Sequence, residues 1–568
     1  MRPFHPHFPI LSFLAILFSA VLIDGCKGGN DAIVPGDYLV SPLPREITPT
    51  QGEFILSRGT SVFIDIDPSM MDSAASLLKE GIEGALGWSP RVTLGKKAPS
   101  KRVIALSLDN ELGGELEPFQ REECYRMSVT PSSITITGAT SLGVLHGLQT
   151  LLKCLPTAVP EGKKVSVSLP AADIYDYPAF PYRAFMLDCG RHFFPISTVK
   201  KVLDILALHN INHFHWHLSE DQGWRLEIKK YPRLTEVGSY RPGSPVPGKP
   251  GEIDNIPVSG FYTQDEAREI VSYAKTRGIT VIPEIDLPGH MQAALASYPE
   301  LGCTGGPYEV ACRYGVLDDV LCPGKDGTFE FVKDVLTEVM DIFPSKYIHL
   351  GGDECPKVRW KACPHCQARI RELGIKGSKT KSAEDLLQSC FMAQAEKVLS
   401  SRGRMMIGWN DILSGWDNVV SGEPQKSTVI ASWMRPHSAT IAADLGYKTI
   451  MCPVGHLYFS NAERNALRGE ESIRTVYDLD VIPKELSEEK GKNIIGVEAC
   501  IWSERVADEE KLLWELLPRI STLSELGWTD ARDYGGYLPR LRKMTGLYSS
   551  RGWNWKEDIA EAWGEKKD

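Results

Sequence analysis

Short apolar runs alternate with amphipathic helical stretches through most of the 568-residue chain. The runs are rich in β-branched and aromatic residues, which is typical of buried strands. Eight candidate strands can be counted, at residues 184–188, 213–217, 279–284, 347–350, 405–409, 429–433, 449–452 and 496–502. Helical patterns separate most of them, at residues 196–208, 264–277, 383–401 and 511–526. Eight βα units in one domain predict an α/β fold, a closed (β/α)8 TIM barrel with its active site at the carboxyl ends of the strands.

The residues before the barrel have a different, mixed pattern. Residues 37–175 contain strand-like runs at 52–56, 61–65, 102–108, 125–129 and 133–137, and helical patterns at 72–87 and 141–152. This pattern predicts a smaller α+β domain, and because it holds no catalytic constellation, a supporting role. Prolines at 178 and 181 mark the joint. We therefore expect a barrel over residues 179–530, followed by a helical segment at 531–568 that packs on it.

Bulk composition fits a soluble globular protein, with 42% hydrophobic and 24% charged residues. The formal net charge is −10 and no basic tract is present, which argues against nucleic acid as a partner. Composition does not indicate the oligomeric state.

The amino terminus resembles an export signal. Residues 8–23 form an apolar run that is too short for an ordinary membrane span, and Gly25-Cys26 follows it. A small residue before a cysteine is typical of bacterial lipoprotein signals, although Asp24 is atypical there. We expect residues 1–26 to be a lipoprotein signal with Cys26 lipidated, and the protein to be exported and held at the cell envelope by this lipid alone. A plain secretory signal with an incidental Cys26 is the alternative.

Thirteen cysteines are consistent with an oxidising compartment. Suggestive groups are Cys303, Cys312 and Cys322, then Cys355, Cys363 and Cys366. Cys363-Pro-His-Cys366 has the two-residue gap of a zinc knuckle, but no second such pair lies nearby, and closed zinc sites use four ligands. The pattern favours loop disulfides of undetermined pairing, with free thiols as the second alternative and zinc as the third, so no metal site is expected.

Two adjacent carboxyl groups, Asp353 and Glu354, follow the apolar run at residues 347–350. Gly351 and Gly352 precede them and allow the backbone to turn or to pass close to a ligand. Two like charges in a dry cleft raise one pKa, so that one carboxyl holds a proton while the other stays ionised. An isolated Asp-Glu pair is more often a solvated turn, and the other strand ends are what favour a functional pair here.

Carboxylates, histidines and tryptophans collect at the other predicted strand ends. In chain order these are Arg191-His192, His215-Trp216-His217, Glu220-Asp221, Asp286, Pro288-Gly289-His290, Trp409, Trp433, His456-Leu457-Tyr458 and Trp502-Ser503-Glu504. Sugars stack their CH faces on indole rings, and charged side chains bridge their hydroxyls. A single tryptophan is more often core, but three at three strand ends of one barrel indicate a carbohydrate site.

In this order, the motifs resemble those of the β-N-acetylhexosaminidases of glycoside hydrolase family 20, over residues 183–528. The preceding α+β domain resembles the non-catalytic domain common in that family. The resemblance implies retaining exo-hydrolysis of terminal non-reducing β-linked N-acetylglucosamine or N-acetylgalactosamine from glycans or chitin fragments, with no metal or organic cofactor. It also implies an exception to the usual pair of catalytic carboxylates: the substrate's own 2-acetamido oxygen attacks and forms an oxazolinium intermediate.

The resemblance assigns the catalytic roles to three residues. Glu354 would protonate the leaving oxygen and then activate water. Asp353 would accept the acetamido N–H and stabilise the developing positive charge, while Tyr458 would hold the acetamido oxygen in line. Such a positioned nucleophile can lower the barrier by roughly 7–11 kcal/mol.

The same resemblance assigns the substrate pocket. Trp409, Trp433 and Trp502 would surround the acetamido methyl group and the sugar ring. Arg191 and Glu504 would hold ring hydroxyls.

Behind the pocket, His290 would contact Glu354, with the acidic pair Glu220-Asp221 behind it tuning the acid. The family commonly has Asp-Asp there, so the longer Glu220 leaves its reach to His290 open. Ser460 stands where the family often has an aspartate that contacts a sugar hydroxyl, which leaves the choice between glucosamine and galactosamine sugars open.

Three other functions remain open at this point. His215 and His217 on one strand are also typical of metal-dependent amidohydrolases, although no further histidine-rich ligand set follows. A glycan-binding lipoprotein without turnover would explain Glu220 and Ser460. A relative of the lacto-N-biosidases, which release a disaccharide, would need a pocket open at the sugar's C3.

Overall fold

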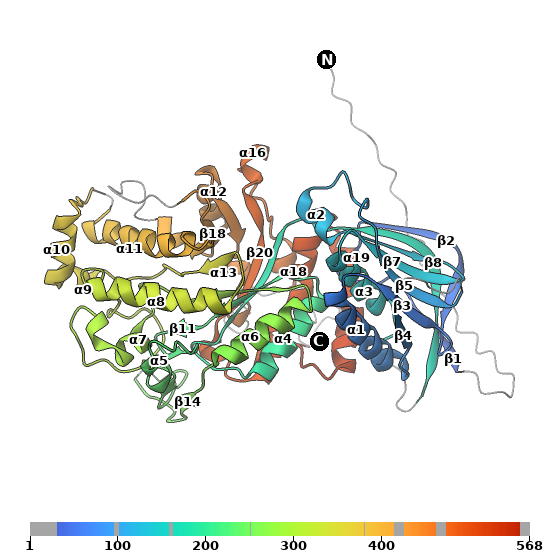
Figure 1. The fold of residues 1–568 in the computed structure, drawn as a ribbon, viewed down its shortest axis with the longest axis horizontal. Coiled ribbons are helices and arrows are strands. Elements are labelled where there is room, and N and C mark those ends of the chain that lie inside the picture. Colours follow the sequence, from blue (N-terminus) through green and yellow to red (C-terminus); the bar gives the residue numbers. More distant parts are fainter. Residues whose placement is uncertain are drawn as a thin grey trace, which may run out of the picture.

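The computed structural model describes residues 31–95, 101–157, 163–249, 251–379, 381–413, 425–461 and 473–556. They form two units that lie side by side, an amino-terminal sheet and a closed barrel (Figure 1). Among these residues, no helix combines the length and the apolar character needed to cross a membrane. The expected lipoprotein signal at residues 1–26, with Cys26, lies outside the described residues.

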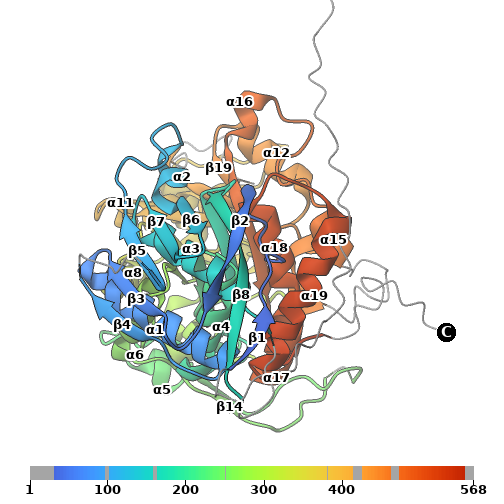
Figure 2. The ribbon, with the colours of Figure 1, turned by 90° about the vertical axis from the view of Figure 1, so that its right-hand side faces the viewer.

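The amino-terminal unit is an eight-stranded mixed sheet in the order β1-β8-β6-β7-β5-β3-β4, with β2 also paired to β8. Its strands are β1 (Ala32–Pro35), β2 (Glu46–Leu56), β3 (Ser61–Asp65), β4 (Arg91–Leu94), β5 (Val103–Leu108), β6 (Tyr125–Val129), β7 (Ser133–Gly138) and β8 (Val165–Asp176). Helices α1 (Pro68–Leu86) and α3 (Ser141–Lys153) cover the face turned to the barrel, and α2 (Pro118–Glu123) lies at its edge (Figure 2). All five strands and both helices expected here are present.

The barrel is closed, with strand order β10-β15-β16-β17-β18-β19-β20-β9 and every pairing parallel. Its strands are β9 (Tyr182–Asp188), β10 (His213–His217), β15 (Thr280–Glu284), β16 (Tyr347–His349), β17 (Met405–Trp409), β18 (Val429–Ser432), β19 (Lys448–Met451) and β20 (Ile494–Ile501). Each predicted strand is present. The predicted TIM barrel preceded by a smaller domain is confirmed.

Helices surround the barrel and insertions lengthen several of its loops. The longer helices are α4 (Ile196–Leu208), α6 (Gln264–Lys275), α8 (Asp326–Ile342), α10 (Pro364–Glu372), α11 (Ala383–Ser400), α12 (Pro436–Asp444), α17 (Glu509–Leu516) and α18 (Arg519–Trp528). Shorter ones are α5 (Arg233–Glu236), α7 (Gln292–Ser297), α9 (Val358–Ala362), α13 (Val454–Leu457), α15 (Ile473–Tyr477) and α16 (Glu488–Gly491). Two-stranded ribbons β11–β12 (Ser219–Glu220, Gly223–Trp224) and β13–β14 (Tyr240–Arg241, Val258–Ser259) follow strand β10.

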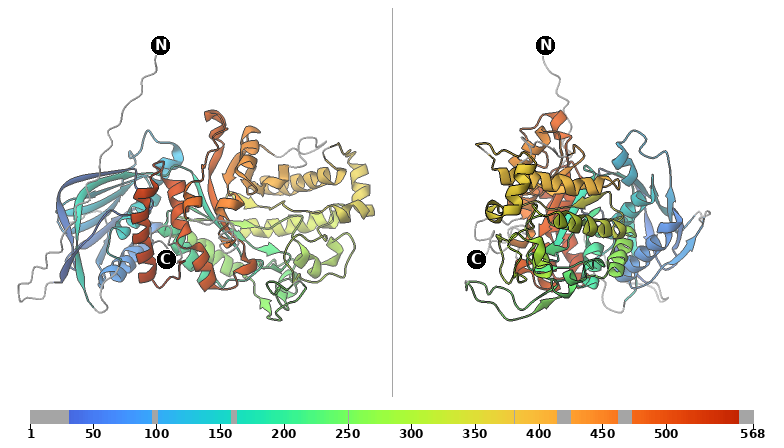
Figure 3. Two further views of the ribbon diagram at one scale, coloured as in Figure 1. Left: turned by 180° about the vertical axis from the view of Figure 1, so that it is seen from behind. Right: turned by 60° about the vertical axis from the view of Figure 1, so that its left-hand side comes forward.

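The prediction of one continuous helix at residues 511–526 is wrong. The structure has two helices there, α17 ending at Leu516 and α18 beginning at Arg519. Pro518 separates them, because proline has no N–H to donate and disfavours helical backbone in the residue before it. The expected carboxy-terminal helix is α19 (Tyr534–Ser550), which lies with α18 between sheet and barrel (Figure 3).

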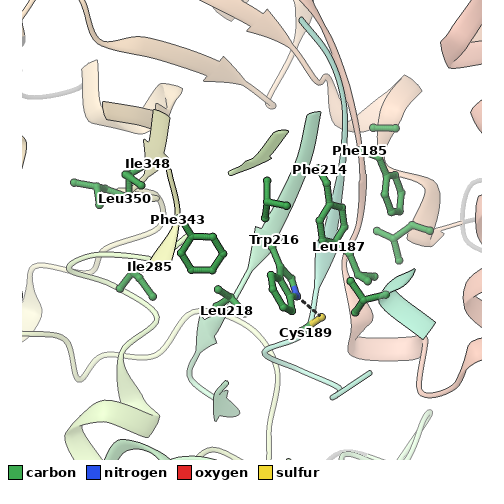
Figure 4. Packing of buried hydrophobic residues seen from close by; sticks show 14 of the residues in the cluster. Phe185, Leu187, Cys189, Phe214, Trp216, Leu218, Ile285, Phe343, Ile348 and Leu350 are labelled. Carbon is green, nitrogen blue, oxygen red and sulfur yellow. Dashed lines mark hydrogen bonds between the residues drawn. The ribbon is translucent and has the colours of Figure 1, made fainter. Parts of the chain in front are cut away.

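Strand periodicity decides which side chains face the barrel interior. On β10, Phe214 and Trp216 point outward into the apolar layer beneath the helices, where they pack near Phe185, Leu187 and Phe343 (Figure 4). The alternate residues His215 and His217 therefore point inward, because successive strand side chains lie on opposite faces. The Trp216 indole N–H donates to Cys189 Sγ at 3.2 Å. Polar residues are thus held inside the barrel by an apolar layer outside it.

The expectation of loop disulfides is wrong for this structure. No disulfide joins any of the twelve cysteines of the described residues. Four of them, from three separate segments, gather instead in one cluster: Cys303, Cys322, Cys363 and Cys366.

A buried ion pair joins the two units. Arg183 of β9 donates from Nη1 to Glu123 Oε1 of α2 at 3.2 Å, and both side chains are buried. His146 Nε2 lies 2.8 Å from Glu123 Oε2, and Asn212 donates to Glu123 Oε1 at 3.1 Å. Burial alone would raise the pKa of Glu123, but the charge of Arg183 and the contact with His146 lower it from 4.5 to about 2.

We expect Glu123→Ala to lower the free energy of unfolding at neutral pH by about 3–5 kcal/mol, because it leaves the Arg183 charge buried and unpaired. Since the folded-state pKa is depressed, the ionised carboxylate stabilises the fold above pH 4.5 and loses this effect as the pH falls toward 2. Urea unfolding measures the difference in free energy of unfolding between the two proteins, and this difference should become smaller as the pH falls from 4.5 toward 2. The exposed neighbour provides the control, because Glu122→Ala should change stability far less; equal effects would contradict the assignment.

Candidate active site at the carboxyl end of the barrel

The turn after β16 places the two adjacent carboxyl groups. Gly351 and Gly352 have φ of +62° and +94°, where glycine is favoured. A Cβ on Gly351 would lie 1.7 Å from Asp286 Oδ1, so only glycine fits there. Glu354 itself has φ of +42°, a strained value for a residue with a side chain. The chain thus turns sharply and delivers Asp353 and Glu354 to the carboxyl end of the barrel.

His290 contacts both carboxyl groups. Its Nε2 lies 3.5 Å from Glu354 Oε2 and 3.9 Å from Asp353 Oδ2. The Asp353 side chain is 12% exposed, whereas the Glu354 side chain is 40% exposed. Asp353 therefore lies at the floor of the site and Glu354 at its rim.

Both members of the acidic pair reach the other side of His290. Its Nδ1 lies 3.1 Å from Glu220 Oε1 and 3.2 Å from Asp221 Oδ2. Glu220 also pairs with Arg191, so its longer side chain bridges the histidine and the arginine. Burial would lower the pKa of His290, but Glu220 and Asp221 raise it well above its usual range. A protonated His290 follows, which donates toward Glu354.

The carboxyl group with the higher pKa is Asp353. Burial raises the pKa of Asp353 to about 7, helped by the charges of Asp411 and Glu354. The hydrogen bond from His290 lowers the pKa of Glu354 below 4.5. The pKa values of the two carboxyl groups therefore differ, as the sequence predicted. In the free protein, however, its proton resides on Asp353 rather than on Glu354, the residue expected to act as the acid.

Two further acids lie at the site. The sequence analysis missed Asp411, whose carboxylate, just past β17, accepts from the Trp433 indole N–H at 2.8 Å and from the backbone N–H of Glu354. Its position just after a predicted strand was the signal that could have found it. Asp286 was noted at its strand end but given no role; it accepts from the Gly352 N–H at 3.2 Å, and its burial next to Asp353 raises its pKa well above the usual value.

The four aromatic residues form one continuous wall. Ring centroids are 5.8 Å apart for Trp409 and Trp502, 5.9 Å for Tyr458 and Trp502, and 6.3 Å for Trp433 and Tyr458. The Trp409 indole N–H donates to Glu284 at 3.0 Å, which fixes that ring. Trp433 and Trp502 remain half-buried, so their faces can receive an apolar group.

Arg191 lies beside this wall. Its guanidinium is 4.9 Å from the Trp502 ring centroid and 3.4 Å from Asp188. Asp188 also accepts the N–H of Ser503 at 2.9 Å, which ties the first strand of the barrel to the last. Burial raises the pKa of nearby Glu504, although the charge of Arg191 opposes this. Arg191, Trp502 and Glu504 therefore form one edge of the site.

The inward-pointing histidines lie beneath this site in a buried hydrogen-bonded network. His215 is 2.9 Å from Glu498 and 3.0 Å from Glu284, and His349 is 2.8 Å from Glu284. Three of these groups (His215, Glu284 and His349) are close enough to surround an ion. Burial opposes the charge on His215, but the two glutamates raise its pKa to about 10. The hydrogen bonds of His215 and His349 to these glutamates account for the buried histidines without an amidohydrolase site.

Comparison with known proteins identifies the family. Residues 180–531 match the model of the catalytic domain of glycosyl hydrolase family 20, and residues 37–177 match the model of its domain 2. The chain belongs to glycosyl hydrolase family 20. It is a glycoside hydrolase of the β-N-acetylhexosaminidase class, and the resemblance inferred from the strand-end motifs is confirmed.

Relatives in this family span several bacteria. The chain is 38% identical to a β-hexosaminidase of Porphyromonas gingivalis over 93% of its own length, and it spans 66% of that protein. It is 34% identical to a β-hexosaminidase of Vibrio furnissii, covering 86% of this chain and 76% of the relative. The exo-β-N-acetylglucosaminidase structure from Vibrio harveyi, with bound N-acetylglucosamine, matches with a TM-score of 0.77, 29% identity and coverage of 92% and 78%.

Proposed function

We propose that this chain removes single N-acetylglucosamine or N-acetylgalactosamine units from the non-reducing ends of β-linked glycans, with retention of configuration. The observation that carries the proposal is the placement of Asp353 and Glu354 on His290, facing a wall of Trp409, Trp433, Tyr458 and Trp502. Carboxyl groups beside stacked aromatic rings suit a sugar with an apolar acetyl group.

The geometry supports distinct roles for the two carboxyl groups. In this proposal Asp353, at the floor, accepts the N–H of the 2-acetamido group, which then directs its oxygen at the anomeric carbon. Glu354, at the rim, protonates the leaving oxygen and then takes a proton from water. Tyr458 donates to the acetamido oxygen, while the tryptophans exclude water around the methyl group.

A cavity of about 360 Å³ opens beside Glu354, which supports the role of Glu354 at the leaving group. Lys357, Asp385, Gln388 and Asp411 contribute to its lining. Because Glu354 protonates the leaving oxygen, the departing part of the glycan belongs on the side of the site where Glu354 lies. We therefore assign this cavity to the leaving group.

We also propose that the protein is exported and anchored to the bacterial cell envelope through a lipid on Cys26. The apolar run at residues 8–23 followed by Gly25-Cys26 supports this.

The direct test compares aryl β-N-acetylglucosaminide with aryl β-glucoside. We expect a preference above about 10³-fold in kcat/KM for the acetamido sugar, since the glucoside lacks the internal nucleophile. Replacing acetyl by mono-, di- and trifluoroacetyl should lower the rate stepwise, because fluorine withdraws electrons from the attacking oxygen. NMR should show the β-anomer as first product. Equal cleavage of both sugars, or a rate insensitive to fluorine, would overturn the substrate-assisted mechanism.

A further inference from the structure

Four cysteine side chains meet at one point outside the active site. Cys322 Sγ lies 3.5 Å from Cys366 Sγ and 3.7 Å from Cys363 Sγ, and Cys303 Sγ lies 3.8 Å from Cys366 Sγ. All four sulfurs lie within 4.8 Å of one another. The cluster joins the segment before α8, which supplies Cys303 and Cys322, to the start of α10, which supplies Cys363 and Cys366.

These separations match a single tetrahedral metal ion. A disulfide needs sulfurs about 2.05 Å apart, well below the measured separations. Zinc binds thiolates at about 2.3 Å, which places the sulfurs of a tetrahedral site about 3.8 Å apart. An iron–sulfur cluster binds its cysteines through separate irons, which spreads the sulfurs further than is seen here. We propose that Cys303, Cys322, Cys363 and Cys366 bind one structural zinc ion.

Two turns face each other at the cluster. Cys363-Pro-His-Cys366 opens α10, and Cys322-Pro-Gly324 faces it. A Cβ on Gly324 would lie 2.2–2.3 Å from the backbone of His365 and Cys366, so the two turns approach as closely as glycine permits. This approach brings Cys322 to the pair Cys363 and Cys366, and Cys303 adds the fourth sulfur from a separate segment.

The cluster has apolar surroundings. Trp360, Ile370, Leu386 and Leu387 pack around the sulfurs in a separate apolar cluster, which keeps water out. Zinc binding releases the thiol protons to solvent, with no change in oxidation state. Cys303 is only half-buried, which gives the ion a path of entry.

The site would tie together the two loops that carry the catalytic groups. The Leu321 N–H donates to Pro288 O at 3.1 Å, two residues before His290. Trp360 lies on the segment that follows Glu354, and its indole N–H donates to Leu321 O at 2.9 Å. Four protein ligands leave no position open for substrate, so the ion supports these loops and takes no part in the hydrolysis.

Metal content of the full chain tests the proposal directly. Protein secreted into an oxidising compartment and purified without chelating resin or added metal should contain about one zinc per chain by inductively coupled plasma mass spectrometry. Cys363→Ser and Cys366→Ser should lower this several-fold. Cys390→Ser, which alters another buried cysteine of the same apolar cluster, should retain the zinc.

Thiol labelling of the unmutated protein covers the case in which a variant fails to fold. Alkylation in denaturant with chelator and without reductant should label all four cysteines, and the native zinc-loaded protein should protect them.

Cobalt(II) in place of zinc should give the visible absorption of a tetrahedral thiolate site. A strong chelator should lower Tm by about 5 °C or more, reversed by zinc. Metal-free protein whose four cysteines resist alkylation would overturn the proposal in favour of disulfides. Metal-free protein with four free thiols would also overturn it.

Discussion

Glu354→Gln is expected to cause the largest loss of activity. An amide cannot give up a proton, so kcat/KM on substrates with sugar leaving groups should fall by about 10²–10⁴-fold. Glutamine keeps the shape of the side chain, and the 3.5 Å contact with His290 can persist, so folding and Tm should change little. Steady-state kinetics on chitobiose, together with a thermal melt, measures both effects.

The leaving group provides the internal control for Glu354. An aryl oxygen of low pKa departs without protonation, so the loss in kcat/KM should shrink on dinitrophenyl N-acetylglucosaminide. Glu489→Gln, on the exposed surface of α16, removes an equal charge far from the site and should leave both substrates unaffected. A loss independent of the leaving group would assign the acid role to another residue.

Most of the fold was predictable because strand and helix periodicities differ along the barrel. On β10 the sequence His213-Phe-His-Trp-His217 alternates polar and apolar residues, which is typical of a strand with one apolar face. β8 was missed because Pro170 interrupts its apolar run; β1 was missed because it is short and largely exposed. The break between α17 and α18 follows from Pro518, whose effect on the preceding backbone outweighed an otherwise continuous helical pattern.

The site was predictable where its residues follow strands and harder to predict where it depends on contacts between loops. Asp353, Trp409 and Trp502 follow directly from their strands. The bridging of Glu220 between Arg191 and His290 depends on two loop conformations that no local pattern specifies. The cysteine cluster is the clearest example. Cys303 and Cys322 lie far along the chain from Cys363-Pro-His-Cys366, and only the packing of α10 against the preceding loop brings the four sulfurs together.

The ionisation of the pair makes Asp353 the second test of the mechanism. With the pKa of Asp353 at about 7 and that of Glu354 below 4.5, the pair holds one proton between these limits. Below the lower limit both groups are protonated, and Asp353 cannot stabilise positive charge. Above the upper limit both are ionised, and no acid remains. The productive form carries the shared proton on Glu354, so kcat/KM should follow a bell whose alkaline limb lies near pH 7.

Asp353→Asn should change both the rate and the shape of this bell. Removing the buried charge that faces the developing oxazolinium should lower kcat by about 10²–10³-fold. The variant keeps only the Glu354 carboxyl, and the hydrogen bond from His290 holds the pKa of this group below 4.5. The alkaline limb of the pH profile should therefore move from near pH 7 to below pH 4.5. Asp265→Asn, on the exposed start of α6, should leave rate and profile unchanged. An unmoved alkaline limb in Asp353→Asn would show that the limb belongs to another group. A retained rate would show that charge at Asp353 does not stabilise the transition state.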